Sequence, residues 1–104
     1  MEYQITIRSL AHRNLVEIER WYDEQGEGLG DKFQLEFEGT LERIHRLPFR
    51  APLIYKQTRR IEMNGFPYAV LYCVEESEIF ILKVIHVRRH PKRFNVKPHG
   101  NGIH

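Results

Sequence analysis

The first quarter of the chain changes from a period of two to a helical period. Residues 3–7 alternate apolar and polar side chains and are rich in β-formers, which predicts a half-buried strand. After Ser9, the expected N-cap of a helix, apolar residues recur at steps of three and four while charged residues fill the other faces. This spacing predicts an amphipathic helix whose buried stripe consists of Ala11, Leu15, Ile18 and Tyr22.

A second helical pattern follows a glycine-rich break at residues 26–30. Asp31 and Gln34 resemble a capping box, so the second helix is expected to open at Asp31. Proline disfavours the helical conformation in the residue before it, which places the end of this helix close to Leu47, directly before Pro48. Two helices joined by a short loop form an antiparallel hairpin, and the apolar stripe of the second is Phe33, Phe37, Leu41, Ile44 and Leu47.

The second half of the chain has the pattern of a three-stranded meander. A strand is expected over Ile54–Met63, and Asn64-Gly65 then predicts a hairpin turn, because both residue types tolerate a positive φ. The next strand is expected over Phe66–Val74, followed by a polar turn at residues 75–77. The last strand, Ile79–Val87, is apolar on both faces and is therefore expected inside the sheet.

The element order predicts the fold class. One strand, two helices and three further strands (β-α-α-β-β-β) give an α+β fold, in which a helical hairpin packs on one face of a mainly antiparallel sheet. A chain of 104 residues forms a single domain, expected here at residues 1–94. Asn95–His104 contains a proline, two glycines and little to bury, so a flexible C-terminal tail is expected there.

The composition indicates the cellular compartment, and it shows that charge is divided unevenly between the two halves of the chain. The lone Cys73 cannot form an intramolecular disulfide, and neither a signal peptide nor a membrane-spanning run is evident, so a cytoplasmic protein without a membrane partner is expected. Residues 1–48 carry six Lys/Arg and ten Asp/Glu, a charge of −4, whereas residues 49–104 carry ten and four, a charge of +6. The basic half is expected to face an anionic partner, with simple solvation of these charges as the alternative.

The common catalytic templates are missing from the sequence. It contains no glycine-rich phosphate loop, no HExxH, no paired cysteines and no nucleophile elbow. His86 and His90 lie four positions apart but across the end of a predicted strand, a poor arrangement for a metal site. The sequence therefore predicts no metal and no cofactor.

A basic and aromatic cluster on the meander is the more specific signal. Guanidinium groups bind phosphates or carboxylates through paired donors, and tyrosine rings stack on bases. In the alternative interpretation the tyrosines face the helices as core residues and the arginines are ordinary edge charges. The cluster consists of Lys56, Arg59, Arg60, Tyr68, Tyr72, His86, Arg88, Arg89, His90, Lys92 and Arg93.

Several segments, in their order and spacing, carry a resemblance to a known family. The chain resembles the RelE/ParE family of bacterial type II toxins over roughly residues 3–94, and two of the segments are closer to the ParE branch. The segments are the apolar stripe of the first helix, GLGDKF at 28–33, LERI at 41–44, Arg60-Ile61, FPY at 66–68, and VIHVRR at 84–89 with Pro91.

The RelE branch implies ribosome-dependent cleavage of mRNA by basic groups and a tyrosine. Lys56 and Arg88 match basic positions of that branch, but Ala69 stands where an arginine is expected and Phe94 where the tyrosine is expected. A methyl group cannot neutralise phosphate and a phenyl ring cannot transfer a proton, and one lost donor costs about 10² to 10³ in rate. As the alternative to a non-catalytic toxin, an endoribonuclease would use Lys56, Arg60, His86, Arg88 and His90.

The resemblance therefore favours a ParE-like toxin that inhibits DNA gyrase by binding and is neutralised by a cognate antitoxin. A non-toxic nucleic-acid or protein binding module is a further alternative. The residues expected to bind the target are Lys56, Arg59, Arg60, Arg88, Arg89, Lys92 and Arg93. Those expected to bind the antitoxin, in a groove beside the helical hairpin, are Leu15, Tyr22, Phe33, Phe37, Arg88 and Arg89.

Overall fold

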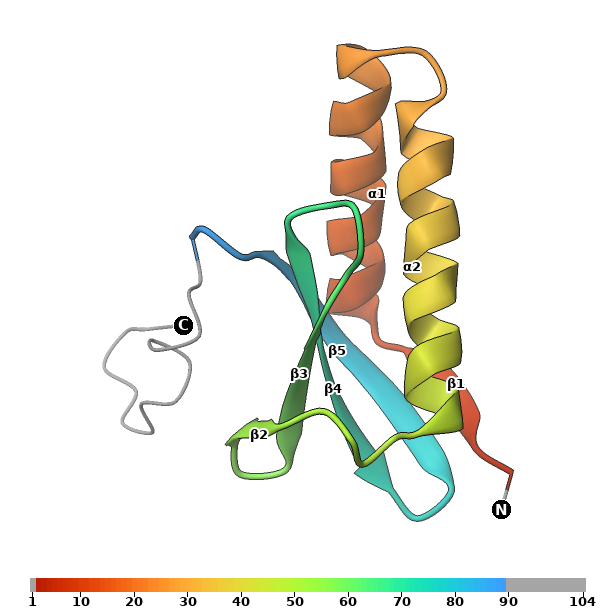
Figure 1. The fold of residues 1–104 in the computed structure, drawn as a ribbon, viewed down its shortest axis with the longest axis vertical. Coiled ribbons are helices and arrows are strands. Elements are labelled where there is room, and N and C mark those ends of the chain that lie inside the picture. The colour runs from red at the N-terminus through yellow and green to blue at the C-terminus, as the bar shows by residue number, and fades with distance from the viewer. Residues whose placement is uncertain (1, 90–104) are drawn as a thin grey trace.

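The computed structural model describes residues 2–89, and the predicted tail at 95–104 lies outside this range. Two helices lie side by side as an antiparallel hairpin beside a twisted sheet, and the turn that joins them lies beyond the end of the strands (Figure 1). The elements are β1 (Gln4–Ile7), α1 (Ser9–Gln25), α2 (Leu29–Arg46), β2 (Leu53–Tyr55), β3 (Thr58–Glu62), β4 (Tyr68–Glu75) and β5 (Glu78–His86).

The sheet has five strands in the order β1-β5-β4-β3-β2. β1 pairs with β5 in parallel, whereas the remaining neighbours pair antiparallel. The predicted α+β class, with a helical hairpin on a mainly antiparallel sheet, is confirmed. The predicted interior position of the last strand is confirmed as well, because β5 has β1 on one side and β4 on the other.

The single strand predicted at Ile54–Met63 is wrong: this segment forms two strands, β2 and β3, and the order is β-α-α-β-β-β-β. The chain reverses at Lys56, whose φ of 51° lies in the left-handed region. Glycine, asparagine and aspartate enter this region with little strain, whereas lysine gives no such signal in a sequence. The tight turn makes β2 a three-residue edge strand of the sheet.

Both predicted helix starts are displaced from their true positions. The N-cap position of α1 is Arg8 instead of Ser9, and that of α2 is Gly28 at φ 80° instead of Asp31, which lies in the first turn; neither N-cap residue forms a side-chain capping bond. The Gly30 N–H donates to Asp23 Oδ1 at 3.0 Å, so a carboxylate of α1 satisfies a free amide at the start of α2. A Cβ built on Gly30 would come within 2.5 Å of the same oxygen, so a larger residue there would displace the Asp23 carboxylate from this contact.

The two predicted hairpins around β4 are confirmed. Gly65 has a φ of 78°, and the Met63 N–H donates to the Tyr68 carbonyl at 2.8 Å, which closes the loop between β3 and β4. β4 begins at Tyr68, two residues later than predicted, after Pro67. The polar turn between β4 and β5 holds Glu76 at a φ of 57°.

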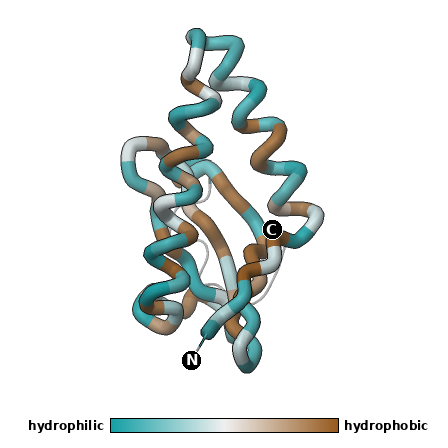
Figure 2. The backbone as a smooth tube through the Cα atoms, turned by 90° about the vertical axis from the view of Figure 1, so that its right-hand side faces the viewer, coloured by the Kyte–Doolittle hydropathy of each residue, from teal (hydrophilic) through white to brown (hydrophobic). Residues whose placement is uncertain are grey.

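The core lies between the helical hairpin and one face of the sheet. The helices and central strands contribute alternating hydrophobic residues, while the turn between the helices is mainly hydrophilic (Figure 2). Burial of such side chains, at about 25 cal/mol per Å² of apolar surface, is the main force that holds the two layers together. The largest fully buried side chains are Tyr72, Phe33, Ile44, Ile79, Ile81 and Val70.

Candidate functional site

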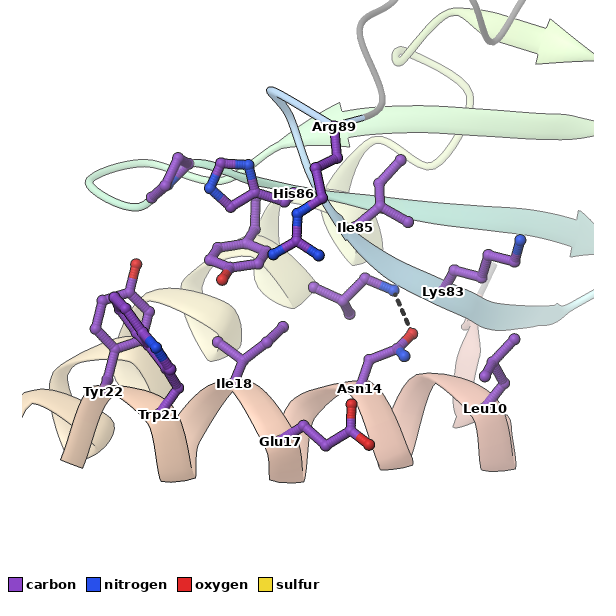
Figure 3. Close-up of a pocket in the computed structure, with 13 residues that line it drawn as sticks. Leu10, Asn14, Glu17, Ile18, Trp21, Tyr22, Lys83, Ile85, His86 and Arg89 are labelled. Carbon is purple, nitrogen blue, oxygen red and sulfur yellow. Dashed lines mark hydrogen bonds between the residues drawn. The ribbon is translucent and has the colours of Figure 1, made fainter. Parts of the chain in front are cut away.

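A groove of about 640 Å³ runs between α1 and the second half of β5. Figure 3 shows one face of α1 opposite the end of β5, with Arg89 reaching from the strand end toward the helix. We call this site the α1–β5 groove. Its lining includes Leu10, Asn14, Glu17, Trp21 and Tyr22 of α1, Tyr68 of β4, and Lys83, Ile85, His86 and Arg89.

The groove exists because β1 is much shorter than β5. β1 pairs only with the first part of β5, from Glu78 to Ile81. In the next backbone hydrogen bond at this edge, the Arg8 N–H donates to the Ile81 carbonyl. α1 begins directly after Arg8. Further along, the Val84 N–H donates to Asn14 Oδ1 at 3.1 Å (Figure 3). The Asn14 side chain thus accepts the hydrogen bond that the carbonyl of a neighbouring strand would accept if β1 were longer.

One end of the groove is built from packed aromatic rings. The Tyr22 and Tyr68 rings lie 6.3 Å apart, and the Tyr68 and His86 rings lie 5.1 Å apart, both edge to face. Burial raises the pKa of both tyrosines, so the two hydroxyls stay protonated at neutral pH. Burial, together with the charges of Arg89 and Arg88, lowers the pKa of His86 below its usual 6.5 and favours the neutral imidazole.

The outer lip of the groove is apolar and its rim is charged. Leu10 is 39% exposed and Trp21 is 52% exposed, a large apolar area for two residues of a surface helix. Glu17 lies on the helix side, while Lys83 and Arg89 lie on the strand side. The groove therefore combines a strand edge, apolar anchor points and a mainly basic rim, which suits an extended or helical peptide with acidic side chains.

The structure does not bring the predicted basic cluster onto one surface. Lys56 lies in the β2–β3 turn, while Arg88 follows the far end of β5, and by register the two are on the order of 25–30 Å apart along the strands. Arg60 is only 3% exposed and pairs with Glu62 at 3.7 Å. Arg59 donates to the Phe49 and Ala51 carbonyls, so it fixes the connector between α2 and β2.

Of the residues proposed for target binding, Arg88 and Arg89 are exposed and adjacent. The two tyrosines of the predicted basic and aromatic cluster are core residues, as the alternative interpretation expected. Tyr72 is fully buried, and Tyr68 is partly buried and packs against the core. Burial raises the pKa of Tyr72, and its hydroxyl donates to the Pro48 carbonyl at 2.8 Å. The remaining predicted site residues, His90, Lys92 and Arg93, and also Phe94, lie outside the described residues.

The set expected to bind the antitoxin divides into core and surface positions. Leu15, Phe33 and Phe37 are 7%, 0% and 4% exposed and belong to the core between the helices and the sheet. Tyr22 and Arg89 do line the α1–β5 groove. Most helix residues of the groove thus lie beside the buried stripe, which contributes only Ile18 and Tyr22 to the lining.

Sequence reasoning missed those helix positions, although a signal was present. Leu10, Asn14, Glu17 and Trp21 recur at steps of four, three and four, the spacing of one helix face. Two of the four are large apolar residues, which marks a second partly apolar stripe beside the buried one. Asn14 is also a poor helix former in mid-helix, a position where its side chain needs a specific partner.

The helical hairpin on a mixed sheet, with an open groove beside the last strand, defines the chain as a small α+β protein. Its family is given by sequence: the family model described as "ParE toxin of type II toxin-antitoxin system, parDE" matches residues 5–91. The chain therefore belongs to the ParE toxin family of type II toxin-antitoxin systems.

Comparison with solved structures agrees with the fold. The chain is similar to a structure described as "Chromosomal ParDE TA system from P. aeruginosa", with a TM-score of 0.72 and 16% sequence identity. The similarity covers 82% of this chain and 96% of that one. No curated protein matches the sequence. Within the described range, neither helix is long and apolar enough to cross a membrane.

Proposed function

We propose that this protein is a cytoplasmic ParE-like toxin that inhibits DNA gyrase by binding it, and that a cognate antitoxin neutralises the toxin by occupying the α1–β5 groove. Membership of the ParE toxin family supports the toxin role. The observation that carries the antitoxin site is the edge of β5 beyond Ile81, which β1 does not cover and which faces an apolar lip and a basic rim.

The proposed gyrase contact centres on Arg88 and Arg89, which are adjacent, exposed and directly after β5. Arg89 also lines the groove, so a segment bound there would cover part of the target-binding surface. Neutralisation then follows from steric overlap, with no change of fold required in the toxin.

A gyrase supercoiling and cleavage assay with purified components tests the target. The wild-type protein is expected to inhibit supercoiling and to increase cleaved DNA at micromolar concentration, and the Arg88→Glu/Arg89→Glu pair is expected to lose most of this effect. Arg13→Glu/Arg20→Glu makes the same charge change on exposed positions of α1 outside the groove lining and serves as the matched control. Wild-type protein without effect on gyrase would reject the proposed target.

Calorimetry with the proposed cognate antitoxin tests the groove separately. Trp21→Ala is expected to weaken the complex about 30-fold, because a half-exposed tryptophan at an interface commonly contributes about 2 kcal/mol. Leu35→Ala, at a residue that is 68% exposed on α2, is the matched control and is expected to bind as wild type. Equal affinity of the Trp21 variant would place the antitoxin elsewhere, whatever the gyrase assay shows.

The mRNA-cleavage alternative gains no support from the geometry. Its proposed residues are spread out: Lys56 and Arg88 lie at opposite ends of the sheet and Arg60 is buried against Glu62. A general acid–base site needs its groups within hydrogen-bond reach of one substrate. Primer extension on translated mRNA in induced cells would reveal cuts in the ribosomal A site if the alternative were correct.

A further inference from the structure

A second cavity, toward the opposite edge of the sheet from the groove, is lined by arginines. It measures about 600 Å³ and lies between the last turn of α2, the connector at 50–52 and the edge of β3. We call it the arginine cavity. Its charged lining residues are Arg43, Arg46, Arg50, Arg60 and Glu62.

The arginines of this cavity have different tasks. Arg43 Nη2 donates to the Glu62 carbonyl at 2.9 Å, which ties α2 to the edge of β3. Arg60 forms an ion pair with the Glu62 carboxylate at 3.7 Å. Arg46 and Arg50 are exposed, and neither forms an ion pair with any carboxylate among residues 2–89. Two guanidinium groups at the mouth of the cavity are therefore available to an anionic ligand.

The backbone of β3 adds a donor on the same side. The Arg60 N–H points away from β4 and donates to the Pro52 carbonyl at 3.1 Å. Because successive amides of a strand alternate in direction, the Glu62 N–H also points away from β4, at the edge that lines the cavity. β2 ends its pairing with β3 at Leu53 and Arg59, so it does not cover this part of the edge.

The walls of the cavity are fixed before any ligand arrives. The buried Tyr72 hydroxyl donates to the Pro48 carbonyl at 2.8 Å, and Arg59 donates to the carbonyls of Phe49 at 3.0 Å and Ala51 at 2.6 Å. These bonds hold the connector that carries Arg50. A fixed wall lowers the entropy cost of binding, since the ligand does not have to order the loop.

The electrostatic balance favours an anion despite the nearby C-terminal end of α2. Four arginines against one glutamate leave the lining with a formal charge of +3. The carbonyl end of a helix corresponds to a partial charge of about −0.5, which offsets only a small part of it. A planar guanidinium binds tetrahedral phosphate oxygens through paired donors, which makes arginine well suited to phosphate.

An exposed aromatic ring lies on the same connector. Phe49 is 57% exposed, and the Arg59 guanidinium carbon lies 5.2 Å from the centre of its ring. An exposed ring next to basic side chains is the combination that single-stranded nucleic-acid sites use, with the charges on the backbone and the ring under a base.

From this arrangement we infer that the arginine cavity is a phosphate-binding site, in which Arg46 and Arg50 hold the phosphate group. The phosphate is carried either by a single-stranded nucleic acid, with Phe49 beneath a base, or by a small ligand. This site is distinct from the groove and from the proposed gyrase contact at Arg88 and Arg89.

Amide spectra of the ¹⁵N-labelled full chain, titrated with inorganic phosphate and with a short single-stranded oligonucleotide, test the site. Both probes are expected to shift the amides of the non-proline residues at 46–52 and of residues 60–62. Arg46→Gln/Arg50→Gln is expected to weaken oligonucleotide binding about tenfold, because each exposed charged contact contributes up to about 1 kcal/mol. The slope of log affinity against log salt is expected to fall by about 1.4, or roughly 0.7 for each lost contact to a single strand.

Arg13→Gln/Arg20→Gln is the matched control, because it removes the same charge from exposed positions of α1. An oligonucleotide that binds more tightly than phosphate and shifts Phe49 identifies a nucleic-acid strand, whereas equal binding identifies a small phosphate ligand. The inference is overturned if neither probe shifts these amides, or if the control pair loses as much affinity. The inference is also overturned if hexaglutamate, an acidic peptide without phosphate, shifts these amides while both phosphate probes leave them unchanged.

Discussion

The α1–β5 groove and the arginine cavity have the same geometric origin and different chemistry. Each lies where a short edge strand, β1 or β2, leaves part of a longer neighbour uncovered. In the groove the side-chain oxygen of Asn14 accepts from a strand amide, and in the cavity the Arg43 guanidinium donates to a strand carbonyl. Short edges limit uncontrolled strand pairing, and the side chains beside each edge then decide which partner fits.

The largest expected effect comes from the aromatic core behind the groove. Phe33 is fully buried and packs on Tyr22, Phe66 and Tyr68, so Phe33→Ala is expected to destabilise the fold by about 3–5 kcal/mol through lost contacts and a residual cavity. Urea denaturation measures this loss. Phe49→Ala, at the exposed ring of the connector between α2 and β2, is the matched control and is expected to cost less than about 1 kcal/mol. Similar losses would mean that the two regions depend equally on packing.

The next effect concerns the wall of the arginine cavity. Tyr72→Phe keeps the ring but leaves the buried Pro48 carbonyl without its donor, at an expected cost of about 1–3 kcal/mol in unfolding free energy. Amide shifts are expected around residues 48–52, with little change in the α1–β5 groove. Tyr55→Phe, at an exposed position, is expected to change stability by less than about 0.5 kcal/mol. Shifts concentrated in the groove would contradict the separation of the two sites.

A smaller effect is expected for Asn14→Ala at the edge of β5. The Val84 N–H loses its acceptor, at a cost of about 1 kcal/mol, while alanine regains up to about 0.7 kcal/mol of helix propensity. The net change in stability is therefore a few tenths of a kcal/mol, and hydrogen exchange at the Val84 amide is the sharper measurement. Faster exchange there is expected in Asn14→Ala and not in His12→Ala, which changes an exposed position on the same helix. Unchanged exchange would show that the bond does not protect the edge.

The smallest effect is the pH dependence of stability that His86 contributes in the groove. The pKa of folded His86 is lowered from 6.5 by burial, Arg89 and Arg88, so the unfolded chain binds its proton more readily than the folded protein does. The contribution of His86 to the free energy of unfolding is therefore fully present above about pH 6.5. It is lost as the pH falls through that value toward the pKa of the folded state. Denaturation at pH 7.5 and 5.5 should show a smaller difference for His86→Gln than for wild type. An equal difference in both proteins would assign the pH dependence to other groups.

The elements that could be predicted from the sequence are those with local signals. Apolar spacing gave both helices, Pro48 gave the end of α2, and Gly65 gave the β3–β4 hairpin. The reversal at Lys56 could not be predicted, because a positive φ in lysine is a cost that surrounding structure imposes. The Asp23–Gly30 contact that begins α2 joins two helices, so no capping pattern within one helix reveals it.

The candidate sites were harder to predict than the fold. Arg59 and Arg60 are adjacent in the sequence, but their side chains lie on opposite faces of β3, one bonded to the connector and the other to Glu62. The partners of the two side chains depend on the path of the connector between α2 and β2, which no local sequence pattern predicts. The groove depends on the unequal lengths of β1 and β5, and strand ends are the least certain part of a sequence-based assignment.

The parallel pairing of β1 with β5 determines when the sheet can finish folding during synthesis. Gln4 pairs with Glu78, so β1 waits for a partner 74 positions later in the chain. Contacts this distant in sequence form late and slowly, because a long loop must close before they contribute. The helical hairpin can form early on the nascent chain, but the sheet that supports both sites cannot. An interrupted polypeptide that lacks β5 therefore has neither a complete sheet nor the α1–β5 groove, and both form only after His86 has been synthesised.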